Sequence, residues 1–218
     1  SISVRNFSLD QTSLLLMLQA LRRSRDVTTL NIYNAGLSLG GLQYLVEKLP
    51  DTTVLNLCLD YNPIVDDRFG AEAKKGGTNA APNLFAALLG GQSKLRSLSL
   101  RGNKITDNGA IAIAAALEKN DVLVSVNLFD NLITDKGALA VVEGLKLNST
   151  LRGLSLAKNR LEDSSAQALA DVLAGYEASP TMLERRAEVE ARISAHNKTA
   201  QEALKKKKDA RVDLMLPL

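Results

Sequence analysis

A repeat of 28 residues is the feature that most constrains this chain. In each copy, repeat positions 1, 4, 6 and 11 are apolar, and position 9 is Asn in most copies. Five stretches share this template: VTTLNIYNAGL (27–37), VLNLCLDYNPI (54–64), LRSLSLRGNKI (95–105), LVSVNLFDNLI (123–133) and LRGLSLAKNRL (151–161). Ile2, Val4 and Leu9 fit the same template one repeat earlier. Six copies in phase predict a stack of similar units, because one unit cannot bury its apolar face alone.

The second half of each repeat predicts a helix. Positions 16, 19, 20 and 23 are apolar, and spacings of three and four residues place them on one helical stripe. In the clearest copy they are Ala110, Ile113, Ala114 and Leu117, and in the last copy Ala166, Leu169, Ala170 and Leu173. Thr106-Asp107, Thr134-Asp135 and Glu162-Asp163 precede these stripes, and we expect them to supply capping oxygens and negative charge to the helix starts.

The Asn at position 9 has a structural explanation. After each strand the backbone must turn inward, which leaves N–H and C=O groups without sheet partners. An amide side chain both donates and accepts hydrogen bonds, so it can satisfy them from one repeat to the next. We therefore predict a structural asparagine ladder that Ala35 and Phe7 interrupt at the amino end. Its members are Asn62, Asn103, Asn131 and Asn159.

The stretch SLSLRGNKITDNGAIAIAAAL (97–117) resembles the ribonuclease-inhibitor type of leucine-rich repeat. The resemblance covers residues 1 to about 176. It implies an α/β solenoid, with parallel strands on the concave face and helices on the convex face. The residues after the array predict a C-terminal helical extension. The same resemblance extends to leucine-rich-repeat activators of the small GTPase Ran and to small repeat proteins of ciliary and flagellar axonemes.

One repeat carries an insertion. The step from position 54 to position 95 is 13 residues longer than the 28-residue repeat, which places the extra residues near 65–81. RFGAEAKKGGTNAAP (68–82) has the composition of a phosphate-binding loop, but its lysines precede the glycine pair, so the P-loop spacing fails. We interpret the segment as a loop, idle or held by a partner, before an intact helix that carries Pro82, Phe85, Ala86 and Leu89 at the stripe positions.

The sequence offers few residues for a catalytic or metal site. His196 is the single histidine and Cys58 the single cysteine. Triads, Cys–His pairs and multi-histidine metal sites are therefore excluded from the repeats. We predict a protein that is not an enzyme and that has no cofactor. The lone cysteine also favours a reducing compartment, and no apolar run approaches the roughly 20 residues of a membrane span. The sequence therefore indicates a cytoplasmic protein.

The predicted concave face carries residues typical of protein interfaces. Positions 3, 5 and 7 point away from the core because positions 4 and 6 point into it. Position 7 provides Tyr33, Asp60, Arg101 and Phe129 in successive repeats. Tyr, Arg and Phe are residue types that anchor interfaces, although scattered surface aromatics are also common. We favour an interface, on the ground that an exposed Phe129 is costly without a partner.

Residues 177–218 lose the template and form a charged tail. We expect one long helix over residues 181–208, which either caps the last repeat or reaches a neighbouring protein. The run Lys205, Lys206, Lys207 and Lys208 is either a solvated helix end or a contact to nucleic acid or tubulin. The apolar end, with Leu214 and Leu216, is expected to dock on the array or on a partner.

These observations favour a non-enzymatic scaffold that binds other proteins of a multi-subunit cytoplasmic or cytoskeletal assembly, such as an axoneme. A small-molecule substrate, a membrane and, less firmly, nucleic acid are not expected among its partners. The alternative is a regulator of a small GTPase, which would bind one nucleotide state in preference to the other.

Overall fold

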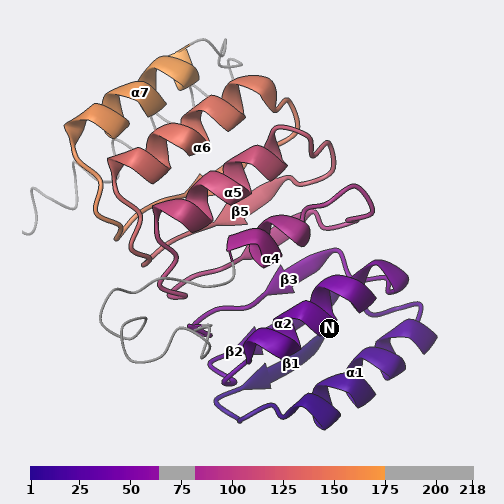
Figure 1. Ribbon diagram of the computed structural model, residues 1–218. Helices are drawn as coiled ribbons and strands as arrows, with labels where there is room; N and C mark the ends of the chain where they lie inside the picture. The colour runs from indigo at the N-terminus through magenta and orange to yellow at the C-terminus, as the bar shows by residue number, and fades with distance from the viewer. Residues whose placement is uncertain (64–81, 175–218) are drawn as a thin grey trace, which may run out of the picture. The chain divides into compact units, whose positions relative to one another are not determined.

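The computed structural model describes residues 1–63 and 82–174, and residues Ser1–Leu173 form one compact unit. Strands and helices alternate along this unit (Figure 1). The strands are β1 (Ile2–Arg5), β2 (Thr29–Tyr33), β3 (Asn56–Cys58), β4 (Ser97–Ser99), β5 (Ser125–Asn127) and β6 (Gly153–Ser155). The helices are α1 (Gln11–Arg23), α2 (Leu39–Lys48), α4 (Pro82–Ala87), α5 (Asp107–Leu117), α6 (Asp135–Leu147) and α7 (Asp163–Ala174), with a turn of 3₁₀ helix, η1 (Leu49–Asp51), after α2.

All six strands belong to one parallel sheet in the order β1-β2-β3-β4-β5-β6. The register aligns position 4 of each repeat with position 4 of the next: Ile2, Leu30, Leu57, Leu98, Val126 and Leu154. Leu57 therefore pairs with Leu98, 41 residues later, across the longer repeat. The predicted α/β solenoid of parallel strands and helices is confirmed.

The sheet has one covered face and one open face. In β2 to β5, side chains at positions 4 and 6, such as Leu30 and Ile32, are buried, whereas those at positions 3, 5 and 7 are only half-buried. Figure 1 shows the helices on one side of the strands. We call the opposite side, formed by positions 3, 5 and 7, the open face. Apolar burial between strands and helices is therefore what stacks the repeats.

The helical stripes complete this core. Ala110, Ile113, Ala114 and Leu117 of α5 are all buried, and Val141 of α6 belongs to the same core cluster. The two helices approach closely at Gly144, which has no side chain. A Cβ atom at this position would lie only 2.7 Å from the Ala114 carbonyl oxygen. The stripe expected for α7 differs, since Ala166 and Ala170 are exposed. No described helix covers the far side of α7, which accounts for the exposure.

The helix of the longer repeat is shorter than the sequence indicated. α4 ends at Ala87, and Leu89 lies in the following turn, where its N–H donates to the Ala86 carbonyl. Phe85, Leu88 and Leu89 are nevertheless buried, so the apolar side chains still fill their layer of the core. Gly90 and Gly91 follow directly, and consecutive glycines favour the end of a helix. The prediction of an intact helix was therefore wrong in its length.

Candidate functional site

The open face becomes distinctive at the carboxyl ends of its strands. Each repeat places one residue with a left-handed backbone at position 8: Asn6, Asn34, Tyr61, Gly102, Asp130 and Lys158. The φ angles of the non-glycine members range from 46° to 58°, a region that is uncommon for such residues. This turn interrupts the in–out alternation of the strand, so a position-8 side chain can join the position-7 side chains of neighbouring repeats.

Five side chains from five successive repeats form a continuous row, which we call the stacked row. Tyr33 packs edge-on against Tyr61, with 5.3 Å between ring centroids. The Cζ atom of Arg101 lies 5.3 Å from the Tyr61 centroid and 4.4 Å from the Phe129 centroid. Lys158 completes the row, with its Nζ atom 5.5 Å from the Phe129 centroid. Cation–π attraction therefore links repeats that the sheet already joins.

Three of the four predicted surface residues, Tyr33, Arg101 and Phe129, thus lie in the stacked row, and Tyr61 and Lys158 extend it. Phe129 is only half-buried but it is not bare, because Arg101 and Lys158 cover its ring. The premise that the Phe129 ring is bare without a partner is therefore wrong, because these two cationic side chains already cover part of the ring.

Gly102 allows the row to form. Its φ of 67° is left-handed, and a Cβ atom there would lie 2.5 Å from two carbon atoms of the Tyr61 ring. Any other residue would both strain this backbone and displace the ring. The Tyr61 ring therefore packs directly on the Gly102 backbone, which holds it within reach of Arg101.

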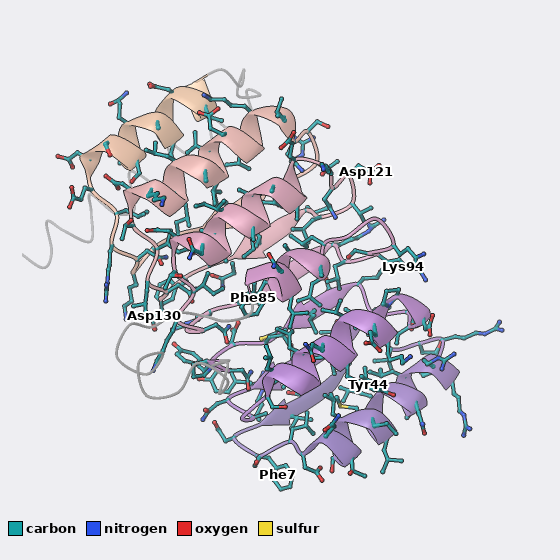
Figure 2. The ribbon with its side chains drawn as sticks, viewed as in Figure 1. Phe7, Tyr44, Phe85, Lys94, Asp121 and Asp130 are labelled. Carbon is teal, nitrogen blue, oxygen red and sulfur yellow. The ribbon has the colours of Figure 1, made fainter. Side chains whose placement is uncertain are left out.

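The acidic side chains beside the row are engaged with neighbouring groups. Asp60 accepts hydrogen bonds from the Ser99 hydroxyl at 2.6 Å and from the Arg101 backbone N–H at 3.1 Å. Asp130 accepts one from the Tyr61 hydroxyl at 3.4 Å. Figure 2 shows Asp130 at the opposite end of the repeats from Lys94 and Asp121. Neither acid forms an ion pair with Arg101 in the part of the chain that the structure describes.

Arg101 is consequently an unpaired cation. Its Nε atom is buried without a hydrogen-bond partner, and its side chain makes no hydrogen bond or ion pair with any described residue. The residue as a whole is half-buried. A guanidinium thus stands between two rings, and the four N–H groups on its terminal nitrogens make no hydrogen bond to any described residue.

Cys58 lies on the same face at position 5, half-buried. Burial raises the pKa of its thiol to about 11, and the nearby negative charge of Asp60 acts in the same direction. Thiols react as thiolates, so this cysteine is poorly suited to nucleophilic chemistry at neutral pH.

The four asparagines of the predicted ladder connect consecutive repeats. Asn131 is representative: its Oδ1 accepts from the N–H groups of Asn103 and Ile105, each at 3.0 Å. Its Nδ2 donates to the carbonyls of Leu100, Leu128 and Phe129. The other members make equivalent bonds to the preceding repeat: Asn62 to Ala35 and Ile32, Asn103 to Asn62 and Leu59, and Asn159 to Ile133 and Leu128. The bonds to buried backbone groups make these side chains structural.

A second pair of asparagines was not singled out from the sequence. Asn120 and Asn148 stand 28 residues apart, three residues before position 1 of a repeat, and both are buried. The Nδ2 of Asn148 donates to the carbonyls of Leu117 and Asn120, at 2.7 and 2.8 Å. Their 28-residue spacing was the signal that could have identified them.

The helix caps differ from the expectation. Thr106 and Thr134 are N-cap residues, but neither side chain caps its own helix. Instead, Asp107 accepts hydrogen bonds from the N–H groups of Thr134 and Gly137, so it caps the helix of the next repeat. Asp135 does the same for Glu162 and the hydroxyls of Ser164 and Ser165. These hydrogen bonds lower the pKa of Asp135, with the Glu162 N–H as the largest cause.

Several predicted features lie outside the described residues. They are the insertion near 65–81, His196, and the tail residues Lys205, Lys206, Lys207, Lys208, Leu214 and Leu216. Within the described ranges, no group of His, Cys, Asp and Glu could hold a metal ion, and no helix is long and apolar enough to cross a membrane.

One cavity of about 220 Å³ lies beside α4. Val46, Leu49, Val54, Leu88 and Leu95 provide most of its apolar wall, and Lys94 is its single charged residue. It contains no acid, histidine or cysteine that could serve as a catalytic base or nucleophile. The open face, rather than this cavity, therefore carries the most chemistry among the described residues.

Comparison with known proteins agrees with this architecture. The family model described as "Leucine Rich repeat" matches residues 91–114, 119–142 and 147–170. These three segments are therefore leucine-rich repeats. Its structure is similar to a solved structure titled "Leiomodin-1 Actin-Binding Site 2 (ABS2)", with a TM-score of 0.48 and 21% sequence identity over 78% of this chain and 95% of that one. No curated protein matches the sequence.

Proposed function

We propose that this protein is a non-enzymatic interaction module whose open face binds another protein. The observation that carries the proposal is the unpaired guanidinium of Arg101, which lies between Tyr61 and Phe129 in the stacked row. Arginine and aromatic side chains contribute most of the binding energy in many protein interfaces. Repeat solenoids also present extended surfaces of this kind for binding.

The structure of the row favours an anchor rather than a catalyst. Tyr33, Tyr61 and Phe129 provide apolar area that is already ordered, so these side chains lose little conformational entropy when a partner binds there. The thiol of Cys58 is the most obvious nucleophile on this face, and its raised pKa disfavours that use. The module would thus act by surface complementarity within a larger cytoplasmic or cytoskeletal assembly, of which an axoneme is one example.

The test is partner capture with crosslinking mass spectrometry from the native cells. The variant carries Tyr33→Ala, Arg101→Ala and Phe129→Ala together. The matched control carries Leu16→Ala, Ile111→Ala and Leu139→Ala, which remove exposed apolar side chains from α1, α5 and α6. We expect the first variant to lose its partner and the control to retain it. Equal recovery by the open-face variant and the parent protein would refute the proposal.

A further inference from the structure

The stacked row has an incomplete charge balance at its centre. Arg101 has no anionic partner among the described residues, although Asp60 follows β3 and Asp130 follows β5, the strands on either side of β4. Asp60 is held by the Ser99 hydroxyl and by the backbone of Arg101 rather than by its guanidinium. The guanidinium of Arg101 is therefore a cation whose neighbouring carboxylates accept hydrogen bonds from other groups.

The position of the guanidinium limits what can satisfy it. Tyr61 lies on one side of Arg101 and Phe129 on the other, so apolar groups flank the cation along the row. Arg101 is half-buried rather than enclosed, and its terminal nitrogens form a planar fork that matches the two oxygens of a carboxylate. Flanking rings also exclude water, which strengthens a charged hydrogen bond formed there.

The surroundings favour an acidic polypeptide. Lys158 ends the row and is exposed, so a second cation lies beside the Phe129 ring at the same strand ends. Asp60 and Asp130 in turn disfavour a phosphate backbone, whose repeated charges would lie against them. The row crosses from β2 to β6, about 20 Å at the usual strand spacing, which an extended segment of about six residues can span.

We propose that Arg101 is the specificity-determining residue of the open face and that it binds the carboxylate of an Asp or Glu in an extended, acidic segment of a partner protein. The aromatic rings of the stacked row pack against the apolar side chains of that segment, and Lys158 adds a second positive charge. This inference rests on the proposed function, because it assigns the partner chemistry of the same surface.

Peptide selection tests the inference even before the partner is identified. A phage library of random linear 12-residue peptides is selected on the full chain and on three variants: Arg101→Met, Arg25→Met, and Tyr33→Ala with Phe129→Ala. Arg25→Met is the matched control, because it removes the same charge from an exposed arginine outside the row. Melting curves identify any variant that fails to fold, in which case Arg101→Gln replaces Arg101→Met.

The expected result is enrichment of Asp- or Glu-containing peptides on the parent protein and on Arg25→Met only. The strongest peptide and its Glu→Gln or Asp→Asn analogue are then titrated by fluorescence anisotropy. We expect the amide analogue to bind the parent at least ~10-fold more weakly, and Arg101→Met to bind both peptides with similar, weak affinity.

Other outcomes overturn the inference in distinguishable ways. Peptides that require Tyr33 and Phe129 but bind equally well without Arg101 or without their acid would refute the carboxylate site and leave the proposed function standing. Tighter binding of a phosphoserine analogue or of an oligouridylate RNA would identify phosphate as the anion. If no enriched peptide requires the stacked row, the inference and the proposed function both fail.

Discussion

The guanidinium carbon of Arg101 lies 4.4 Å from the ring centroid of Phe129, although the two residues belong to adjacent repeats. Arg101 follows β4 and Phe129 follows β5, so the parallel register brings equivalent positions of two repeats into contact. The same relationship continues through Tyr61 on one side and Lys158 on the other. The repeat thus converts a pattern along the chain into a row of side chains across the sheet.

Asn131→Ala should be strongly destabilising. The substitution leaves the buried N–H groups of Asn103 and Ile105 without their acceptor, and it removes the Asn131 donor from the Leu100 carbonyl. We expect a loss of about 3 kcal/mol or more in the free energy of unfolding, measured by urea denaturation. Asn108→Ala, at an exposed site in α5, should change it by less than about 0.5 kcal/mol. Equal effects from both variants would contradict a structural ladder.

Asp107→Ala should weaken the start of α6 rather than that of its own helix. The carboxylate accepts from the Thr134 N–H at 2.8 Å and the Gly137 N–H at 3.1 Å. We expect a loss of about 1–2 kcal/mol in unfolding free energy, and faster amide hydrogen exchange at the first turn of α6. Thr106→Ala is the control and should be nearly neutral, because its hydroxyl makes no capping bond. Faster exchange confined to α5 would contradict capping between repeats.

Gly102→Ala should disturb the stacked row from within. The left-handed φ of 67° and the 2.5 Å approach to the Tyr61 ring leave no room for a methyl group. We expect a loss of about 1–3 kcal/mol in unfolding free energy and a changed near-ultraviolet circular dichroism signal from the tyrosines. Gly40→Ala, where a Cβ atom would meet open space, should be neutral or slightly stabilising. An unchanged tyrosine signal in Gly102→Ala would contradict this packing.

Acid should selectively weaken the contact between the last two described repeats. Hydrogen bonds from the Glu162 N–H and then from Ser164 and Ser165 lower the pKa of Asp135. Because the folded pKa lies below the unfolded value, this contribution is present above pH ~4 and is lost as pH falls through the folded pKa. Thermal melts between pH 7 and pH 2 should show a smaller acid loss for Asp135→Asn than for the parent. Identical acid losses would contradict the assignment.

Cys58 should react slowly and should limit stability in alkali. A pKa of about 11 leaves little thiolate at pH 8, so iodoacetamide should modify the folded protein roughly ten- to a hundredfold more slowly than the urea-unfolded chain. The pKa of the Cys58 thiol is higher in the folded than in the unfolded state. The stability that the protonated thiol contributes is therefore present below pH ~9 and is lost as pH rises toward 11. Cys58→Ser should remove this part of the alkaline loss. Equal alkylation rates in the folded and unfolded states would contradict the buried thiol.

The fold could be predicted from the 28-residue repeat, because residues at equivalent repeat positions have the same role in every unit. Leu30, Leu57 and Leu98 stand at the same position of their repeats, and they pair in the sheet. Asn131 could be assigned for the same reason, since its backbone environment recurs in each repeat. Asn120 and Asn148 were missed, although their spacing carried a comparable signal.

The remaining features depend on contacts between repeats. Thr134 looked like the cap of α6, but the capping carboxylate is that of Asp107 in the preceding repeat, a relationship that a pattern along one repeat does not contain. Tyr61 was missed because alternation along a strand assigns position 7, not position 8, to the open face, and the left-handed turn changes this. Phe129 appeared bare because its cationic covers, Arg101 and Lys158, lie 28 and 29 residues away in sequence.

The most direct test of the central claim is hydrogen–deuterium exchange of the full chain, alone and bound to the captured partner. The account predicts slower exchange on binding in the strand-end segments 56–62, 97–103 and 125–131, which carry Tyr61, Arg101 and Phe129, with no change in the outer residues of α5 and α6. Protection confined to those helices, with unchanged exchange at the strand ends, would contradict binding by the open face.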